Sequence, residues 1–300
     1  MSDQTAPQCV LITGASTGLG KLASLTAARA GHKVYAGMRD SGQKNREARD
    51  EMDGIARSEA LDLHVVDLDV TVTKSAEEAV AHVINDAGRL DVLVNNAGYM
   101  SIGIAEGFSE EQIRRQMDVN FFGPVMLSRA VLPHMRKRKS GLIIHVTSIL
   151  GRVMFPACAF YCASKFALEA YAEVLHYELT PLGIDSVLVE PGPFPTHLLA
   201  NSPGPDDQSR TGGYEQLSAL RETFIESFSQ FFASSEAPNP QLVADAVLNL
   251  IDAPAGARPL RTVCGPDYGA LTINQQAAPV QAEVLRALGM PDLAQRAQSA

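Results

Sequence analysis

A glycine-rich turn near the N-terminus constrains the fold of this 300-residue chain more than any other feature. The apolar run Cys9–Thr13 before it predicts a buried strand, and residues 14–20 are Gly-Ala-Ser-Thr-Gly-Leu-Gly. A stretch rich in alanine and leucine then predicts a helix to Ala30, and residues 32–38 predict a second strand. Such a strand–turn–helix–strand unit is the form that binds dinucleotides, because glycine lets the backbone approach a pyrophosphate and the helix N-terminus attracts negative charge.

Strand and helix patterns alternate through the rest of the chain. Further strands are predicted over residues 63–70, 90–95, 142–148, 184–190 and 261–264. This alternation predicts an α/β fold, a Rossmann-like doubly wound parallel sheet of about seven strands with helices on both faces. Ligands of such a sheet bind at the carboxyl ends of the strands, where Asp69 and Asn96 are expected.

A long helical region is predicted over residues 109–138, with a capping-box pattern at Ser109. The pair Gly123-Pro124 is expected to break or kink it. Asn120 lies in an apolar part of this region, and a buried amide must be hydrogen-bonded. Asn120 is therefore either a structural tie or an active-site amide.

The sequence predicts one domain over residues 1–300, with residues 8–196 as the cofactor-binding and catalytic core. Residues 197–238 are expected to form a substrate lid, because they contain a long polar segment rich in Pro, Gly and Asp without apolar periodicity. The aromatic helix after that segment belongs either to the core or to the wall of an apolar pocket. The weakly amphipathic tail 279–300 packs on its own domain or on a second subunit.

Tyr161 and Lys165 lie four residues apart in a segment with a helical pattern, so both side chains share one face. A cation about 5 Å from a phenol, at an effective dielectric near 20, favours the phenolate by roughly 3 kcal/mol. That corresponds to a pKa lowered by about two units, enough for acid–base work near pH 8. Taken alone, however, the pair is better explained as an amphipathic helix with a buried tyrosine and a solvated lysine.

Four elements in order resemble the short-chain dehydrogenase/reductase family, in its single-domain subgroup. They are Thr13-Gly14-x-x-x-Gly18-x-Gly20, Asn95-Asn96-Ala97-Gly98, Ser148 and Tyr161-x-x-x-Lys165. The resemblance covers roughly residues 8–265. Residues 34–40, Val-Tyr-Ala-Gly-Met-Arg-Asp, are similar to the hydroxysteroid and retinol dehydrogenase branch. That likeness suggests a bulky hydrophobic ketone or alcohol as substrate.

The resemblance implies a role for each matching position. Tyr161 would be the general acid/base, and Lys165 would lower its pKa and hydrogen-bond the nicotinamide ribose. Ser148 would hold the substrate oxygen, and Asn120 would support a water that relays protons. The positions implied to contact the cofactor are Gly14, Ser16, Thr17, Gly18, Leu19, Gly20, Arg39, Asp69, Val70, Asn96, Tyr161, Lys165, Pro191, Gly192 and Thr196.

Arg39, at the end of the second strand, favours NADP(H) over NAD(H). An acid near this position binds the adenosine ribose hydroxyls in dinucleotide folds, whereas an arginine accommodates a 2′-phosphate. Asp40 keeps the alternative open, because a shift of one residue would bring an acid into reach. Thr17 occupies a position where some NADP-preferring members of the family carry a basic residue. Arg39 is also explicable as a solvated loop residue.

Composition excludes several other classes of function. The net charge of −9 disfavours nucleic acid and anionic membranes as partners. No apolar stretch is long enough to span a membrane, and the first residues lack an apolar signal-peptide core. The four cysteines lack metal-ligand spacing, which favours reduced thiols in a cytoplasmic protein without a metal site. Family likeness suggests a homodimer or homotetramer built on the long helices after Gly107 and Ala157.

The sequence therefore predicts an oxidoreductase that transfers a hydride between NADP(H) and a ketone, an aldehyde or a secondary alcohol. The alternative is a nucleotide-sensing or scaffold protein that binds the cofactor without turning it over. The combination of Asn120, Ser148, Tyr161 and Lys165 argues against that alternative, because a sensor needs no general acid. An epimerase or dehydratase is disfavoured by the glycine spacing and by the lack of a larger C-terminal substrate domain.

Overall fold

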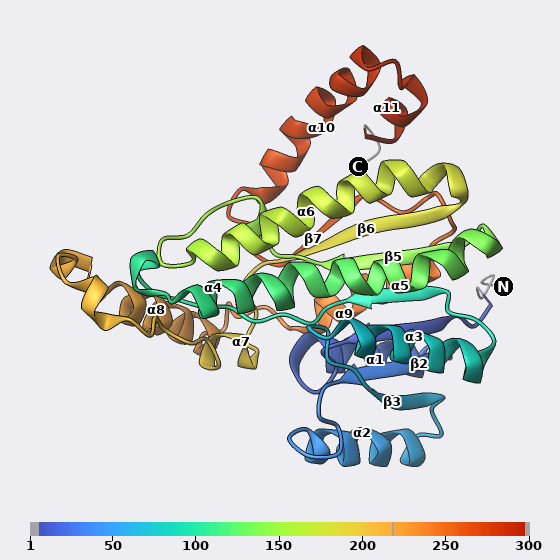
Figure 1. The fold of residues 1–300 in the computed structure, drawn as a ribbon, viewed down its shortest axis with the longest axis horizontal. Helices are drawn as coiled ribbons and strands as arrows, with labels where there is room; N and C mark the ends of the chain where they lie inside the picture. Colours follow the sequence, from blue (N-terminus) through green and yellow to red (C-terminus); the bar gives the residue numbers. More distant parts are fainter. Residues whose placement is uncertain (1–5, 218, 298–300) are drawn as a thin grey trace.

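The computed structural model describes residues 6–217 and 219–297, and its centre is one seven-stranded parallel sheet (Figure 1). The strand order is β3-β2-β1-β4-β5-β6-β7, and every neighbouring pair is parallel. The strands are β1 Cys9–Thr13, β2 Lys33–Met38, β3 Leu63–Asp67, β4 Val92–Asn95, β5 Gly141–Val146, β6 Ile184–Pro191 and β7 Arg261–Cys264. The predicted doubly wound fold is confirmed.

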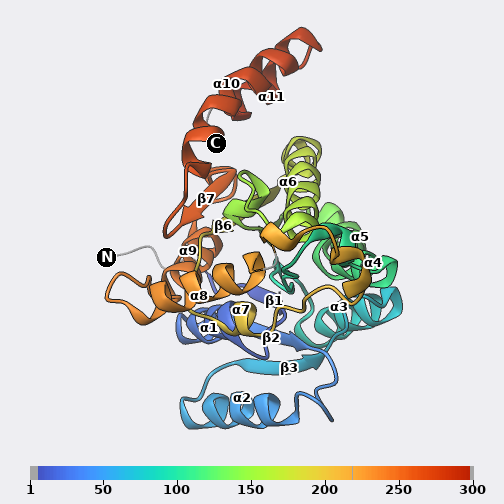
Figure 2. The same ribbon diagram turned by 90° about the vertical axis from the view of Figure 1, so that its left-hand side faces the viewer.

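Helices cover both faces of the sheet because successive strand side chains point to opposite faces (Figure 2). Val10 and Ile12 pack toward α1, α2 and α9, whereas Leu11 packs toward α3, α5 and α6. The helices are α1 Gly18–Arg29, α2 Arg46–Ser58, α3 Thr73–Ala87, α4 Glu110–Met117, α5 Gly123–Arg138, α6 Ala159–Leu179, α7 His197–Ala200, α8 Leu220–Ala233, α9 Gln241–Asp252, α10 Ala270–Ala287 and α11 Pro291–Ala297. None of the helices in residues 6–217 and 219–297 is long and apolar enough to cross a bilayer.

The strand order reverses between β1 and β4, and this switch point opens a crevice at the carboxyl edge of the sheet. Asn96, just after β4, fastens the two strand ends together. Its side-chain amide donates to the carbonyl of Thr13 at 2.7 Å. The Thr13 hydroxyl accepts from the backbone N–H groups of Asn96 and Ala97, at 3.0 and 2.9 Å.

The long helical region differs from its prediction at the Gly-Pro pair. The capping box at Ser109 is present, with Gln112 as its partner. The helix is not broken at Pro124, because this proline occupies the first turn of α5, where a missing N–H costs no intrahelical bond. The irregularity lies just before it, as a π-helical turn Asp118–Phe122 that turns Asn120 into the core.

The C-terminal part was also predicted incompletely. Instead of a tail from Pro279, α10 starts at Ala270, passes through Pro279 and leads away from the body of the molecule (Figure 1). Ala282 and Leu285 pack with Tyr177 of α6, so this segment packs on its own chain. Residues 298–300 of the predicted tail, and residue 218 of the predicted lid, lie outside the described residues.

We predict that Thr13→Val lowers the free energy of unfolding by about 1 to 3 kcal/mol, because the partly buried N–H of Ala97 loses its acceptor and the N–H of Asn96 keeps only the carbonyl of Val94. Thr13→Ser keeps the hydroxyl and serves as the matched control. Urea unfolding of the three proteins measures the difference. Equal stability of the Val and Ser variants would show that these two hydrogen bonds do not hold β1 and β4 together.

Candidate active site

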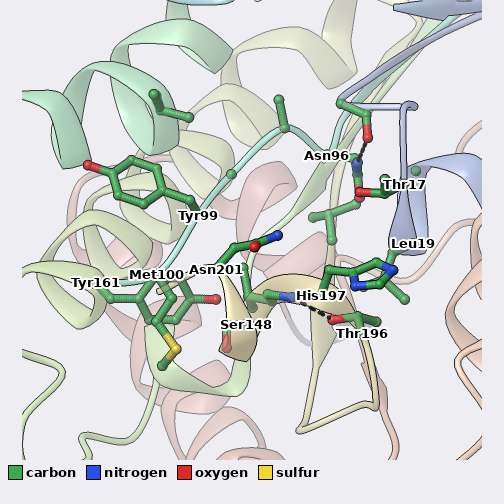
Figure 3. Close-up of a pocket in the computed structure, with 18 of the residues that line it drawn as sticks. Thr17, Leu19, Asn96, Tyr99, Met100, Ser148, Tyr161, Thr196, His197 and Asn201 are labelled. Carbon is green, nitrogen blue, oxygen red and sulfur yellow. Dashed lines mark hydrogen bonds between the residues drawn. The ribbon is translucent and has the colours of Figure 1, made fainter. Parts of the chain in front are cut away.

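A cavity of about 770 Å³ opens at the carboxyl edge of the sheet. Every position predicted to contact the cofactor lines it, and so do Ser148, Tyr161 and Lys165. The structure thus brings together residues from the β1–α1 turn, the ends of β2, β4, β5 and β6, and α6 and α7 (Figure 3). Of the predicted catalytic residues, Asn120 alone does not line the cavity.

The glycine turn leaves the N-terminus of α1 open toward this cavity. Gly14 and Gly18 have φ angles of +68° and +57°, which side chains rarely adopt. Thr17 precedes the helix without capping it through its side chain, and the first turn holds no acidic residue. The backbone N–H groups at this end of the helix are therefore available to an anion, which fits the pyrophosphate of a dinucleotide.

Ser148 was predicted to end a strand, but β5 already ends at Val146. Ser148 instead caps a short 3₁₀ turn, where its hydroxyl oxygen accepts from the N–H of Leu150 at 3.1 Å. The same hydroxyl contacts the carbonyl of Pro191 at 3.5 Å, across to the end of β6. These two contacts hold the Ser148 side chain in the wall of the cavity.

Tyr161 is 5% exposed and points its phenol oxygen toward Ser148 (Figure 3). Burial raises the pKa of Tyr161 above its ordinary value, and a hydrogen bond with Ser148 lowers it only in part. The prediction that the pKa of Tyr161 lies below its ordinary value is wrong for this structure, because desolvation outweighs the groups that favour the phenolate. At neutral pH Tyr161 is a protonated phenol, which is suited to donate a proton.

Lys165 is 4% exposed, and its ammonium group lies 5.7 Å from the centre of the Tyr161 ring. The Nζ atom donates to the carbonyl oxygen of Val146 at 3.0 Å. Burial lowers the pKa of Lys165 to about 8, and the carboxylate of Glu169 opposes that effect. The lysine therefore loses its charge as the pH rises through this value. It is not the solvated lysine that was expected when the Tyr161–Lys165 pair was taken alone.

Asn120 is fully buried, and both the oxygen and the nitrogen of its side-chain amide are hydrogen-bonded. Its oxygen accepts from the N–H of Tyr99 at 3.1 Å, and its amide donates to the carbonyl of Tyr99 and to Ser164, both at 3.0 Å. A Cβ atom at Gly98 would lie 3.3 Å from the Asn120 oxygen and 3.6 Å from Lys165 Nζ. Asn120 is thus a structural tie that also lies close to Lys165.

An apolar wall faces the catalytic residues. Phe224 and Phe228 of α8 lie with ring centres 4.8 Å apart, and Phe155 packs against both. The sequence left this aromatic helix either in the core or in the wall of a pocket, and Phe224, Phe228 and Phe232 line the cavity. Phe155 comes from a loop, where no periodic pattern reveals a buried contact.

Sequence reasoning also missed polar groups of the cavity. Lys44 and Asn45 line it beside Arg39, and the amide of Asn45 donates to the carbonyl of Arg39 at 2.6 Å. His197 and Asn201, from α7 and the residue after it, point into the same space (Figure 3). For Lys44, the only available signal was its closeness to Arg39 in the chain.

The described residues contain no group of three or more His, Cys, Asp or Glu side chains arranged to hold a metal ion. All four cysteines are buried and free. Burial raises the pKa of the thiols of Cys9 and Cys158 to about 12, so both are protonated and unreactive at neutral pH.

We predict that Gly20→Ala destabilises the fold and weakens the binding of a dinucleotide. The added Cβ would lie 2.4 Å from both Asn96 Nδ2 and the carbonyl oxygen of Gly14, so the turn must shift, at a cost of about 1 to 3 kcal/mol. Gly54→Ala in α2 is the control, because nothing lies within 4 Å of its Cβ. Urea unfolding and fluorescence titration with NADH and NADPH measure both effects. A Gly20→Ala protein that binds these dinucleotides as the wild type does would contradict the expected role of this turn.

Comparison with known proteins places the chain in a family. The sequence pattern described as short chain dehydrogenase matches residues 8–206. The 3-ketodihydrosphingosine reductase of Bacteroides thetaiotaomicron is 37% identical over 222 residues, which are 74% of this chain and 73% of that protein. Human retinol dehydrogenase 8 is 35% identical over 281 residues, 89% of this chain and 84% of that protein.

Solved structures agree with this placement. A short-chain dehydrogenase from Streptomyces avermitilis is 29% identical, with a TM-score of 0.73 over 95% of this chain and 98% of its own. The predicted family, and the predicted likeness to its retinol dehydrogenase branch, are confirmed. The chain belongs to the short-chain dehydrogenase/reductase family, whose members are NAD(P)-binding oxidoreductases that act on CH–OH groups.

Proposed function

We propose that the protein transfers a hydride between NADP(H) and a ketone, an aldehyde or a secondary alcohol, with Tyr161 as the general acid/base. The observation that carries the proposal is the buried phenol of Tyr161, directed at Ser148 on the wall of a cavity whose far side is the open N-terminus of α1. The nicotinamide, when bound, supplies or accepts the hydride.

The side chains then account for the proton and for the developing charge. In reduction, negative charge grows on the substrate oxygen as the carbonyl carbon accepts the hydride. Ser148 holds that oxygen, and Tyr161 donates its proton to it. The raised pKa of Tyr161 keeps this proton in place at neutral pH, so the phenol is available as the donor. The nearby ammonium of Lys165 stabilises the phenolate that remains.

The preference for NADP(H) is supported by the charges at the end of β2. Arg39 and Lys44 both line the cavity, whereas the acid next to them, Asp40, does not. A phosphate on the adenosine ribose would find two cations there and no carboxylate from this loop. Asp40 has a φ of +48°, in the left-handed region that L-residues other than glycine rarely adopt.

A bulky apolar substrate is supported by the wall of Phe155, Phe224 and Phe228. The two relatives are named for 3-ketodihydrosphingosine and for retinol, which are both lipids. The segment 197–238 carries part of this wall, in agreement with its proposed role as a substrate lid.

The remaining assignments also stay proposals. Asn120 would support a proton-relaying water, helped by its closeness to Lys165. A homodimer or homotetramer on the outer faces of α5 and α6 would cover Phe122, Phe166 and Val174, which are exposed. A single domain and a cytoplasmic location are expected from the sequence.

We predict that Tyr161→Phe lowers kcat for ketone reduction by about 100-fold or more, because the general acid is lost, and leaves the Kd for NADPH largely unchanged. NADPH consumption with a panel of ketones, steroids and retinoids measures the rate. Tyr177→Phe is the matched control, because it removes a buried hydroxyl at the other end of α6. Retained turnover in Tyr161→Phe would refute the role of Tyr161. Tight NADPH binding by the wild type without turnover on any carbonyl would favour a sensor.

We predict that Arg39→Asp lowers the ratio of kcat/KM for NADPH to that for NADH by about tenfold to 100-fold, because a charge-assisted contact with the 2′-phosphate is replaced by repulsion. Arg46→Asp is the control, because Arg46 is an exposed residue of α2 that does not line the cavity. An unchanged ratio in Arg39→Asp would show that Arg39 does not select the cofactor.

A further inference from the structure

One edge of the proposed lid, residues 202–207 (the lid edge), is hydrogen-bonded to the segment that follows β4. The N–H of Ile102 donates to the carbonyl oxygen of Pro203 at 3.1 Å. The N–H of Asp207 donates to the carbonyl oxygen of Gly107 at 2.9 Å. Backbone groups at both ends of the lid edge are thus paired with the same neighbouring segment. These bonds hold the lid edge alongside the chain that leaves β4.

Two side chains add to this attachment. Gln112 of α4 donates to the carbonyl oxygen of Gly204 at 2.8 Å. Arg221, in the first turn of α8, donates to the carbonyl oxygens of Ile102 and Ser202, both at 3.1 Å. The planar guanidinium has donors in fixed directions, so these two bonds also fix the start of α8. Arg221 therefore joins α8, the lid edge and the segment after β4 at one point.

Farther along α8, the helix meets the body of the protein through aromatic rings. The centre of the Phe155 ring lies 6.2 Å from that of Phe224 and 6.1 Å from that of Phe228. The structure describes every residue of α8, and none of them is buried. Met154, beside Phe155, is 70% exposed. Solvent thus reaches this contact between α8 and Phe155 (the aromatic seam).

An apolar ligand would open these two attachments at different cost. Pulling the lid edge away would leave carbonyl oxygens and a guanidinium group without partners, which an apolar ligand cannot replace. Opening the aromatic seam exposes ring surface, which the surface of an apolar ligand can cover. The three rings of the seam line the cavity, together with Ser148 and Tyr161. A ligand that passes through the seam thus arrives in the cavity that holds the proposed proton donor.

We propose that α8 pivots at Arg221, a positioning residue, so that a bulky apolar substrate enters through the aromatic seam while the lid edge stays attached. Residues 234–236, which follow α8, are exposed, which allows the far end of the helix to move. The entry of a substrate rests on the proposed function, but the motion of α8 does not. The two are therefore tested separately.

Pulsed electron paramagnetic resonance measures the motion in the protein without substrate. One spin label is placed on α3 at Glu77→Cys. The second is placed on α8 at Ser229→Cys or, as the matched control, at Thr223→Cys, two residues after Arg221. All three labelled positions are exposed, and the four native thiols are buried. We expect two populations of distance for Ser229 and one for Thr223, because displacement grows with distance from a pivot.

Arg221→Met removes the pivot, so the Thr223 distances are expected to spread like those of Ser229. Arg221→Lys keeps a donor and is expected to restore part of the single population. Equal distributions at Ser229 and Thr223 in the wild type would overturn the motion, whether both are single or both are double. An unchanged Thr223 distribution in Arg221→Met would overturn the role of Arg221. The wild-type comparison decides on the motion even if Arg221→Met does not fold.

The entry route is tested by cross-linking Phe155→Cys/Phe228→Cys with a bifunctional methanethiosulfonate. We expect NADPH consumption with a bulky ketone to fall by about tenfold or more and to recover with dithiothreitol, because the seam can no longer open. Methyl methanethiosulfonate, which modifies the same thiols without joining them, is the control and is expected to leave turnover in place. Gln112→Cys/Asp206→Cys, cross-linked at the lid edge, is expected to keep its turnover.

Unchanged turnover after cross-linking of the seam, or an equal loss after cross-linking of the lid edge, would overturn this route. A wild type that reduces no ketone contradicts the proposed function instead, and the distance measurement then still decides on the motion of α8.

Discussion

Desolvation of Tyr161 and Lys165 is the constraint on which the rest of this site depends. Both side chains are almost completely removed from water, and burial shifts each toward its neutral form. The phenol keeps its proton, and the ammonium comes close to losing its own near neutral pH. A proton donor beside a developing negative charge benefits from this arrangement only if the lysine remains a cation.

The fold delivers these groups to one place through its strand order. Because the order reverses between β1 and β4, the connections that follow these two strands lead to opposite faces of the sheet, and Thr13 and Asn96 hydrogen-bond the two strand ends to each other. The same edge leaves the N-terminus of α1 uncapped and open to an anion. The proposed pyrophosphate and proton-transfer sides of the cavity thus arise from one sheet edge, with α6 presenting Tyr161 and Lys165 and α8 supplying the apolar wall.

Much of this could be predicted from local sequence pattern. The glycine turn, the strands and the helix that carries Tyr161 and Lys165 are encoded by spacing over a few residues, so their existence and order were predicted correctly. Properties that depend on tertiary packing were not predicted correctly. The pKa of Tyr161 was predicted in the wrong direction because sequence spacing shows a nearby cation but not how much water is excluded. Arg261 meets Glu169 from 92 residues away, and no local pattern indicates such a pair.

The central claim is that Tyr161 is a protonated phenol at neutral pH and therefore a proton donor. Ultraviolet difference titration of the tyrosine absorbance, with Tyr161→Phe subtracted from the wild type, tests it most directly. The account predicts that the difference spectrum shows no phenolate between pH 6 and about 10, because burial raises the pKa of Tyr161 above the ordinary value of about 10. A phenolate that appears near pH 8 and vanishes with Tyr161→Phe would contradict it.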